Sequence, residues 1–139
     1  MKLLILFGIF AVVAAKLEPT PVENGKVYAL ENQEDGAYLS ASGDDAKGGE
    51  YSSRPKEQWR FDETGEKDVY TIRALSGDGS FVSNNQWQLI LVGHGKRLLK
   101  NTKTGLCLQN SGRGRPATEQ PCGRTTSRQR WFVHTTSSA

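Results

Sequence analysis

Three tryptophans, each near the end of a similar stretch of sequence, constrain the fold of this chain more than any other feature. Each stretch runs from a short strand pattern through a glycine-containing turn to a second strand pattern, and closes on a strand that carries the tryptophan. Such repetition indicates units that are too small to bury their own apolar faces and therefore share one core. Because Trp59, Trp87 and Trp131 occupy equivalent strand positions, we interpret them as core residues rather than as platforms for a ligand.

The alternation of apolar and polar residues predicts the strands of each unit. The second unit is short, because residues 81–87 leave no room for a further strand. In the first unit we expect strands at 27–30, 37–41 and 58–61, a short strand at 50–52 and a loop at 42–49. In the second unit we expect strands at 69–75, 80–83 and 86–89, and in the third at 97–101, 104–108 and 129–133.

The first 15 residues have the features of a secretory signal peptide. Lys2 gives a basic start, an apolar run follows, and small residues at 13–15 suit the cleavage site. A buried N-terminal helix or anchor is the alternative, although the run is shorter than the roughly 20 residues of a transmembrane helix. We therefore predict a secreted, extracellular protein with an extended leader at 16–25, a single domain at 26–134 and a frayed tail at 135–139.

Both cysteines, Cys107 and Cys122, lie in the third unit. In an exported chain two cysteines are expected to form one disulfide, because the compartment is oxidising. Two free thiols or a metal-binding pair are the alternative, but no cluster of cysteine and histidine accompanies them.

The third unit contains Gly105-Leu106-Cys107-Leu108, then Cys122, and it closes on Gln129-Arg130-Trp131. In order and spacing it resembles the repeated unit of the ricin-type (R-type) β-trefoil lectin domain. Glu57-Gln58-Trp59 and Asn85-Gln86-Trp87 close the other two units in a similar way. The resemblance covers residues 26–134 and implies an all-β fold, a β-trefoil of three imperfect repeats. It further implies twelve short strands and a disulfide within the third repeat.

The resemblance also implies a shallow sugar pocket within a unit. The family builds it from an Asp after Cys-Leu, an aromatic platform, and an Asn beside the Gln of Gln-x-Trp, so that carboxylate and amide groups bind sugar hydroxyls. In this chain Lys56 and Arg128 stand at the Asn positions. Gln109 and Ser40 replace the Asp, Glu57 replaces the Gln of unit one, and Tyr51 is the one candidate platform there. We therefore expect the fold to be kept and the galactose binding of the family to be lost.

Charge is distributed unevenly along the chain. Residues 16–85 contain 8 Lys and Arg against 14 Asp and Glu, whereas residues 86–139 contain 9 against 1. Such asymmetry indicates either an anionic partner for the later half or two complementary faces of one domain. Guanidinium groups suit sulfate, phosphate and carboxylate. The candidate anion- or glycan-binding residues are Arg113, Arg115, Arg124, Arg128 and Arg130.

Catalytic motifs are absent from the sequence. His94 and His134 lie far apart and neither belongs to a Ser/His/Asp or Cys/His pattern, so we expect no enzyme, metal or cofactor. We predict a secreted, monomeric, lectin-like protein that binds extracellular acidic glycans, without a transmembrane segment or a nucleic-acid partner. The alternative is a salivary or venom-type effector, vasoactive for example, that acts on a host receptor, channel or other cell-surface protein with the trefoil as scaffold.

Overall fold

A computed structural model describes residues 20–136 of the chain. Within this range the chain forms ten short strands, one four-residue α-helix and three 3-10 helices. The strands are β1 (Lys26–Asn32), β2 (Tyr38–Ser42), β3 (Asp45–Gly49), β4 (Trp59–Glu63), β5 (Val69–Ala74), β6 (Gln86–Val92), β7 (Lys96–Asn101), β8 (Cys107–Gln109), β9 (Thr118–Gln120) and β10 (Trp131–Thr135). The helices are η1 (Pro55–Glu57), α2 (Ser80–Ser83), η2 (Gly93–Gly95) and η3 (Ser127–Gln129).

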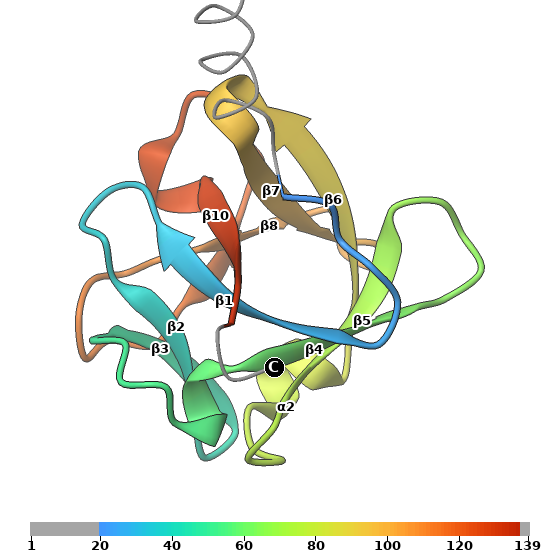
Figure 1. Ribbon diagram of the computed structural model, residues 1–139. Helices are drawn as coiled ribbons and strands as arrows, with labels where there is room; N and C mark the ends of the chain where they lie inside the picture. Colours follow the sequence, from blue (N-terminus) through green and yellow to red (C-terminus); the bar gives the residue numbers. More distant parts are fainter. Residues whose placement is uncertain (1–19, 137–139) are drawn as a thin grey trace, which may run out of the picture.

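Six of the strands close into a barrel. Each pairs antiparallel with the next in the cyclic order β1, β4, β5, β6, β7, β10 and back to β1. Figure 1 looks into this ring, whose centre is filled by apolar side chains of a single large core cluster. Closing the ring pairs each of the six strands on both sides, which protects their backbone groups.

Hairpins attached to the barrel complete two of the three units. The β2–β3 hairpin belongs to unit one and the β8–β9 hairpin to unit three, whereas unit two has helix α2 in the corresponding place (Figure 1). This arrangement is a β-trefoil of three imperfect repeats, which confirms the predicted fold and the short second repeat. The expectation of twelve strands is wrong, because unit two lacks the hairpin.

The three tryptophans form the repeated centre of the core, as predicted. Each is at most 1% exposed. Each indole Nε1–H also donates to a carbonyl oxygen of its own unit, so the polar atom of the buried ring is satisfied. The bonds run from Trp59 to Leu39 at 2.9 Å, from Trp87 to Val82 at 2.8 Å and from Trp131 to Leu108 at 3.2 Å.

Unit two departs from the sequence prediction at 80–83, where we expected a strand and find helix α2. Gly79 begins the turn with φ at 84°, a left-handed conformation that favours glycine. A Cβ at Gly79 would lie 3.1 Å from atoms of both Ala41 and Trp59, so glycine also permits the close approach of unit one. The helix nevertheless places Val82 so that its carbonyl reaches the indole of Trp87. The local apolar pattern therefore predicted the position of Val82 beside Trp87 but not the helical conformation of this segment.

Unit one departs from the prediction at its third strand. Strand β3 spans Asp45–Gly49, inside the stretch expected to be a loop, and residues 50–52 form no strand. The sequence of β3 has no β-branched or aromatic residue, so strand propensity gave no signal. Packing explains the strand instead. A Cβ at Gly48 would lie 2.9 Å from the side-chain oxygen of Asn110, so only glycine allows unit three to approach there.

The chain before β1 packs across one end of the barrel. The Tyr28 hydroxyl donates to the carbonyl of Pro21 at 3.2 Å, and the Arg97 guanidinium donates to the carbonyl of Thr20 at 2.7 Å. Residues 20–25 of the expected leader are thus part of the folded domain. At the other end β10 includes Thr135, and Thr136 is buried, so the domain extends past residue 134. The predicted signal peptide at 1–15 lies outside the described residues.

Cys107 and Cys122 form the predicted disulfide. Cys107 is fully buried on β8, whereas Cys122 follows β9 and is exposed. The bond therefore ties the segment after β9 to β8, the first strand of the same hairpin.

Replacing each tryptophan by phenylalanine is expected to lower the free energy of unfolding by about 1–3 kcal/mol, because a buried carbonyl loses its donor and the ring shrinks. Urea denaturation followed by circular dichroism measures the loss. Leu91→Ala is a control, since Leu91 is 51% exposed and surface substitutions change stability by about 0.5 kcal/mol or less. A tryptophan whose replacement costs no more than the control would not be a core residue.

The free energy of unfolding of the double variant Cys107→Ala/Cys122→Ser is expected to be lower by about 3 kcal/mol. The disulfide that it removes closes a loop with a sequence separation of 15. A reducing agent should destabilise the unmodified protein by a similar amount and leave the double variant unchanged. Equal stability of the two proteins without reductant would contradict this structural role.

Candidate functional site

A hollow of about 180 Å³ lies in unit one, between the β2–β3 hairpin and helix η1. It contains Ser40 and Glu57, two of the residues that the resemblance assigned to the family's sugar pocket. We call it the unit-one hollow. Its lining residues are Ser40, Ala41, Ser42, Lys47, Gly48, Gly49, Glu50, Arg54, Lys56, Glu57 and Gly114.

One wall of the hollow comes from unit three. The loop before β9 runs along β3, where the amide of Gly114 donates to the carbonyl of Gly48 at 2.9 Å and the amide of Ala117 donates to Ala46 at 2.7 Å. Gly114 therefore lines a hollow whose other residues all come from unit one. This contact between units was invisible in the sequence, because it joins residues more than sixty positions apart.

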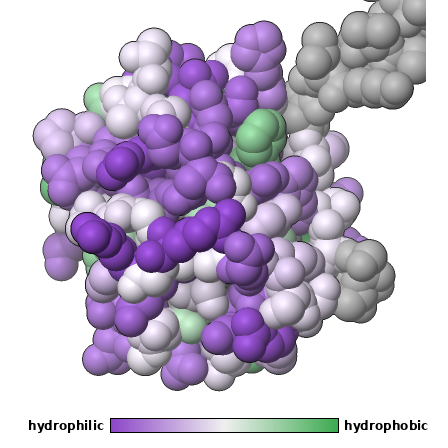
Figure 2. All heavy atoms as spheres, turned by 90° about the vertical axis from the view of Figure 1, so that its left-hand side faces the viewer, coloured by the Kyte–Doolittle hydropathy of each residue, from purple (hydrophilic) through white to green (hydrophobic). Residues whose placement is uncertain are grey.

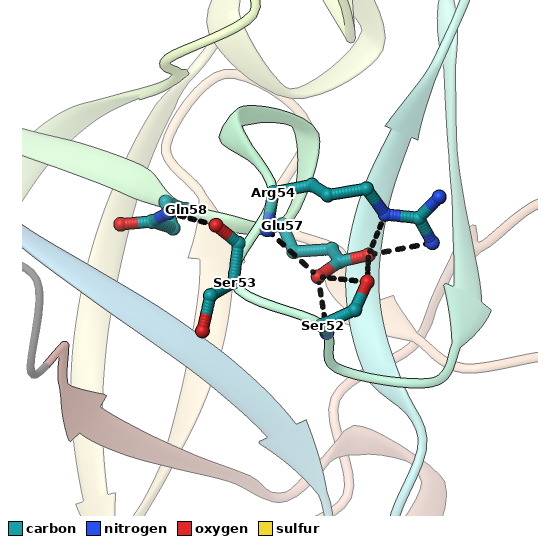
Figure 3. Close-up of polar contacts among 5 residues, drawn as sticks. All are labelled: Ser52, Ser53, Arg54, Glu57 and Gln58. Atoms are coloured by element: carbon teal, nitrogen blue, oxygen red, sulfur yellow. Dashed lines mark hydrogen bonds and ion pairs between the residues drawn. The ribbon is translucent and has the colours of Figure 1, made fainter.

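Glu57 is fully buried at the base of η1, and its carboxylate is saturated with donors (Figure 3). It accepts hydrogen bonds from the backbone amides of Ser52 at 2.6 Å and Arg54 at 3.3 Å. The Ser52 hydroxyl and the Arg54 guanidinium donate to it as well, at 3.1 and 3.2 Å. Glu57 therefore holds the loop before η1 and has little capacity left for a ligand.

These contacts also determine the protonation of Glu57. Burial by itself would raise the pKa of the carboxyl group, because it disfavours the charged form. The hydrogen bonds from Ser52 and Arg54 and the charge of Arg54 outweigh burial, and the pKa lies below its ordinary value. The carboxylate is thus ionised at neutral pH, and its charge is balanced within the protein.

The residue two before each tryptophan has the same role in all three units. In unit three Gln129 accepts from the amide of Gly123 at 2.9 Å and donates to the carbonyl of Pro121 at 2.9 Å. In unit two Asn85 donates to the carbonyl of Phe81 at 2.8 Å. The Gln of Gln-x-Trp is accordingly a residue that holds the preceding loop, and Glu57 is its counterpart.

The other two residues of the expected degenerate sugar site lie elsewhere. Tyr51 is not part of the hollow, since its ring packs against Tyr38 with centroids 5.0 Å apart. Gln109 lies in unit three, where its side-chain oxygen accepts from Gln129 at 3.1 Å. Of the four candidates, the structure brings only Ser40 and Glu57 together.

The candidate arginines also have separate anchors. Arg113 forms an ion pair with Glu50 at 2.5 Å, which joins the basic later half of the chain to its acidic first half. Arg124 donates to the carbonyl of Leu91 at 3.2 Å, and Arg130 donates to the carbonyl of Gly93 at 3.1 Å. The side chains therefore divide between unit one and the β6–η2 corner. Arg115 and Arg128 are exposed.

Ion pairing leaves the hollow with a positive character. Its two acids are balanced, Glu50 by Arg113 and Glu57 by Arg54. Among the described residues, Lys47 and Lys56 make no ion pair, although both line the hollow. Figure 2 shows that the face on this side of the molecule is mainly hydrophilic, with only isolated hydrophobic atoms. The hollow therefore suits a polar ligand with negative charge.

Residues 20–136 contain no group of three side chains suited to hold a metal ion. Within the same range no helix has the length and apolar character needed to span a membrane.

Comparison with known proteins identifies the fold through solved structures. No family model matches the chain, and no curated protein matches it. The Rhizoctonia solani agglutinin is 14% identical with a TM-score of 0.70 and covers 84% of this chain and 100% of its own. The ricin B-like lectin of Macrolepiota procera, solved with lactose, is 19% identical with a TM-score of 0.66 and the same coverages of 84% and 100%.

A glycosidase shares the fold in part of its length. The structure of a GH43 β-1,3-galactosidase matches with 14% identity and a TM-score of 0.71, over 87% of this chain but only 29% of that one. Together these likenesses show that the chain has the R-type β-trefoil lectin fold, as the third unit predicted. At such identities they show the fold alone and not the ligand.

The variant Glu57→Gln is expected to lower the free energy of unfolding at pH 7 by about 1–2 kcal/mol, because charge-assisted hydrogen bonds become neutral ones. The stabilisation by Glu57 is fully present above the unfolded-state pKa of about 4.3. The folded-state pKa of Glu57 is lower, so this stabilisation is lost as pH falls through the folded-state pKa. Stability measured between pH 6 and about 3 should therefore fall less steeply in the variant. Parallel pH profiles of the two proteins would contradict this.

Proposed function

We propose that the chain is a secreted, non-enzymatic, lectin-like protein that binds acidic glycans in the unit-one hollow. The observation that carries the proposal is the state of charge there. Lys47 and Lys56 line the hollow without an ion pair, whereas Glu50 and Glu57 are each balanced by an arginine. The net result is a cationic depression that contains two residues, Ser40 and Glu57, at positions where the resemblance implies a sugar pocket.

The lining offers the two kinds of group that an acidic glycan needs. The ammonium groups of Lys47 and Lys56 are compact positive charges that can bind sulfate or carboxylate from several directions. The hydroxyls of Ser40 and Ser42 can donate to and accept from sugar hydroxyls. Ser40 stands where the resemblance implies an Asp, so this pocket has no carboxylate at that position to accept two hydrogen bonds from galactose hydroxyls.

Secretion is supported by two observations of different kinds. The first 15 residues have a basic start, an apolar run and a small-residue end. The two cysteines of the chain form a disulfide, a bond that persists in oxidising compartments. A glycan on a cell surface or in the extracellular matrix is therefore the ligand class that this protein would meet.

The double variant Lys47→Ser/Lys56→Ser is expected to weaken binding of a heparin-derived hexasaccharide about five- to thirtyfold, since two partly exposed ion pairs contribute about 0.5–1 kcal/mol each. Titration calorimetry at low salt measures the affinity, and raising the salt concentration should weaken binding by the unmodified protein. Arg124→Ser/Arg128→Ser is the matched control. It removes the same charge from exposed residues of unit three and should change the affinity less than twofold.

Two outcomes would overturn the proposal. If both double variants weaken binding equally, the interaction depends on overall charge and not on the hollow. If the unmodified protein binds neither neutral nor sulfated glycans on an array, the lectin-like function fails, and an effector that acts on a protein partner becomes the better hypothesis.

A further inference from the structure

We propose that the glycan site does not end at the hollow but continues over a strip of four rings on the outside of the barrel, as a site for a chain of several sugars. We call the rings of Tyr51, Tyr38, His134 and Phe132 the aromatic strip. This inference rests on the proposed function and specifies the length of its ligand.

The rings form a continuous series from Tyr51, just after β3, across β2 to β10. The centroids of Tyr51 and Tyr38 are 5.0 Å apart, those of Tyr38 and His134 6.1 Å, and those of His134 and Phe132 5.7 Å. All four side chains are partly exposed, whereas the three tryptophans of the domain are buried. A row of half-exposed rings offers apolar faces and edges beside polar atoms, as binding surfaces do.

Strand geometry explains why these rings point outward. Side chains alternate between the two faces of a strand. On β10, Trp131 and Val133 are buried in the core, so Phe132 and His134 lie on the outer face. The same alternation on β2 buries Leu39 and leaves Tyr38 and Ser40 together on the outer side.

The strip begins at the edge of the hollow. In the register of the hairpin, Tyr38 lies opposite Gly49 and Ser40 lies opposite Lys47. Ser40, Lys47 and Gly49 all line the hollow. Tyr38 is therefore the next outward-facing residue along β2 after Ser40, and a ligand that fills the hollow can continue onto its ring.

Charge argues for an acidic glycan chain as the occupant of the strip. The ammonium of Lys96 lies 5.2 Å from the centroid of the Phe132 ring, at the end of the strip away from the hollow. Cations thus stand at both ends, Lys47 and Lys56 at one and Lys96 at the other, separated by rings. In the middle, the Glu31 carboxylate lies 2.8 Å from His134. A carboxylate opposes acidic groups but accepts hydrogen bonds from hydroxyls, so the middle of the strip suits sugar hydroxyls and the two cationic ends suit the acidic groups. An acidic glycan chain presents apolar ring faces, hydroxyls and acidic groups in turn. The aromatic rings, the polar atoms and the lysines of this surface are complementary to these three kinds of group.

The experiment compares two lengths of one ligand, a heparin-derived disaccharide and a hexasaccharide, by titration calorimetry. The variant Lys96→Ser/Phe132→Ala should weaken hexasaccharide binding about tenfold and so lower the ratio of hexasaccharide to disaccharide affinity by about the same factor. The hollow variant Lys47→Ser/Lys56→Ser should weaken both ligands. Lys26→Ser/Leu91→Ala is the matched control, since it removes an exposed lysine and an exposed apolar side chain elsewhere.

Thermal unfolding of each variant checks the fold, and Lys96→Ser alone tests the far end of the strip if loss of the Phe132 ring prevents folding. An unchanged affinity ratio in the strip variants, while the hollow variant still weakens both ligands, would overturn the extended site and leave the proposed function intact. If neither ligand binds the unmodified protein, the proposed function itself fails and the extension falls with it. An affinity ratio that falls equally in the matched control would also overturn the extension.

Discussion

The hydrogen bond from each buried indole to a carbonyl of its own unit is the interaction on which the rest of the fold depends. A tryptophan can fill the core only if its N–H finds an acceptor, because an unsatisfied buried donor costs about 1–3 kcal/mol. Leu39, Val82 and Leu108 supply that acceptor in the three units. The requirement fixes one carbonyl per unit but not its secondary structure, so unit two meets it with a helix and the others with strands.

The second constraint acts two residues before each tryptophan. Gln129, Glu57 and Asn85 all bind the backbone of the preceding segment, so this position stabilises that segment, which in unit one borders the hollow. A charged group there needs compensation, and Arg54 and Ser52 provide it for Glu57. The site of unit one is thus bordered by a residue that the resemblance places beside a ligand but whose contacts here are structural.

Local patterns predicted what depends on local chemistry: the three repeats, the buried tryptophans, the disulfide and most barrel strands. They failed where packing between units decides. Strand β3 has no residue of high strand propensity and is formed by pairing with β2, where Gly48 leaves room for Asn110 of unit three. The wall at Gly114 also comes from another unit. The residues of the candidate site were incompletely predicted for the same reason. Ser40 was identified from the repeat, whereas Lys47 was missed, since β3 was expected to be a loop.

The replacement of the family's Asp by Ser40 has two consequences that belong together. It removes the carboxylate that would bind the hydroxyls of a neutral sugar, and it also removes a negative charge from a hollow that already contains Glu50 and Glu57. Like charges at close range repel each other. A third carboxylate would therefore have repelled an acidic ligand and competed for Lys47 and Lys56. With Ser40 in its place, the arginine-paired acids and the two lysines leave a cationic surface. Ser40 therefore leaves Lys47 and Lys56 as the lysines without an ion pair that line the hollow, which is the physical basis of the proposed acidic ligand.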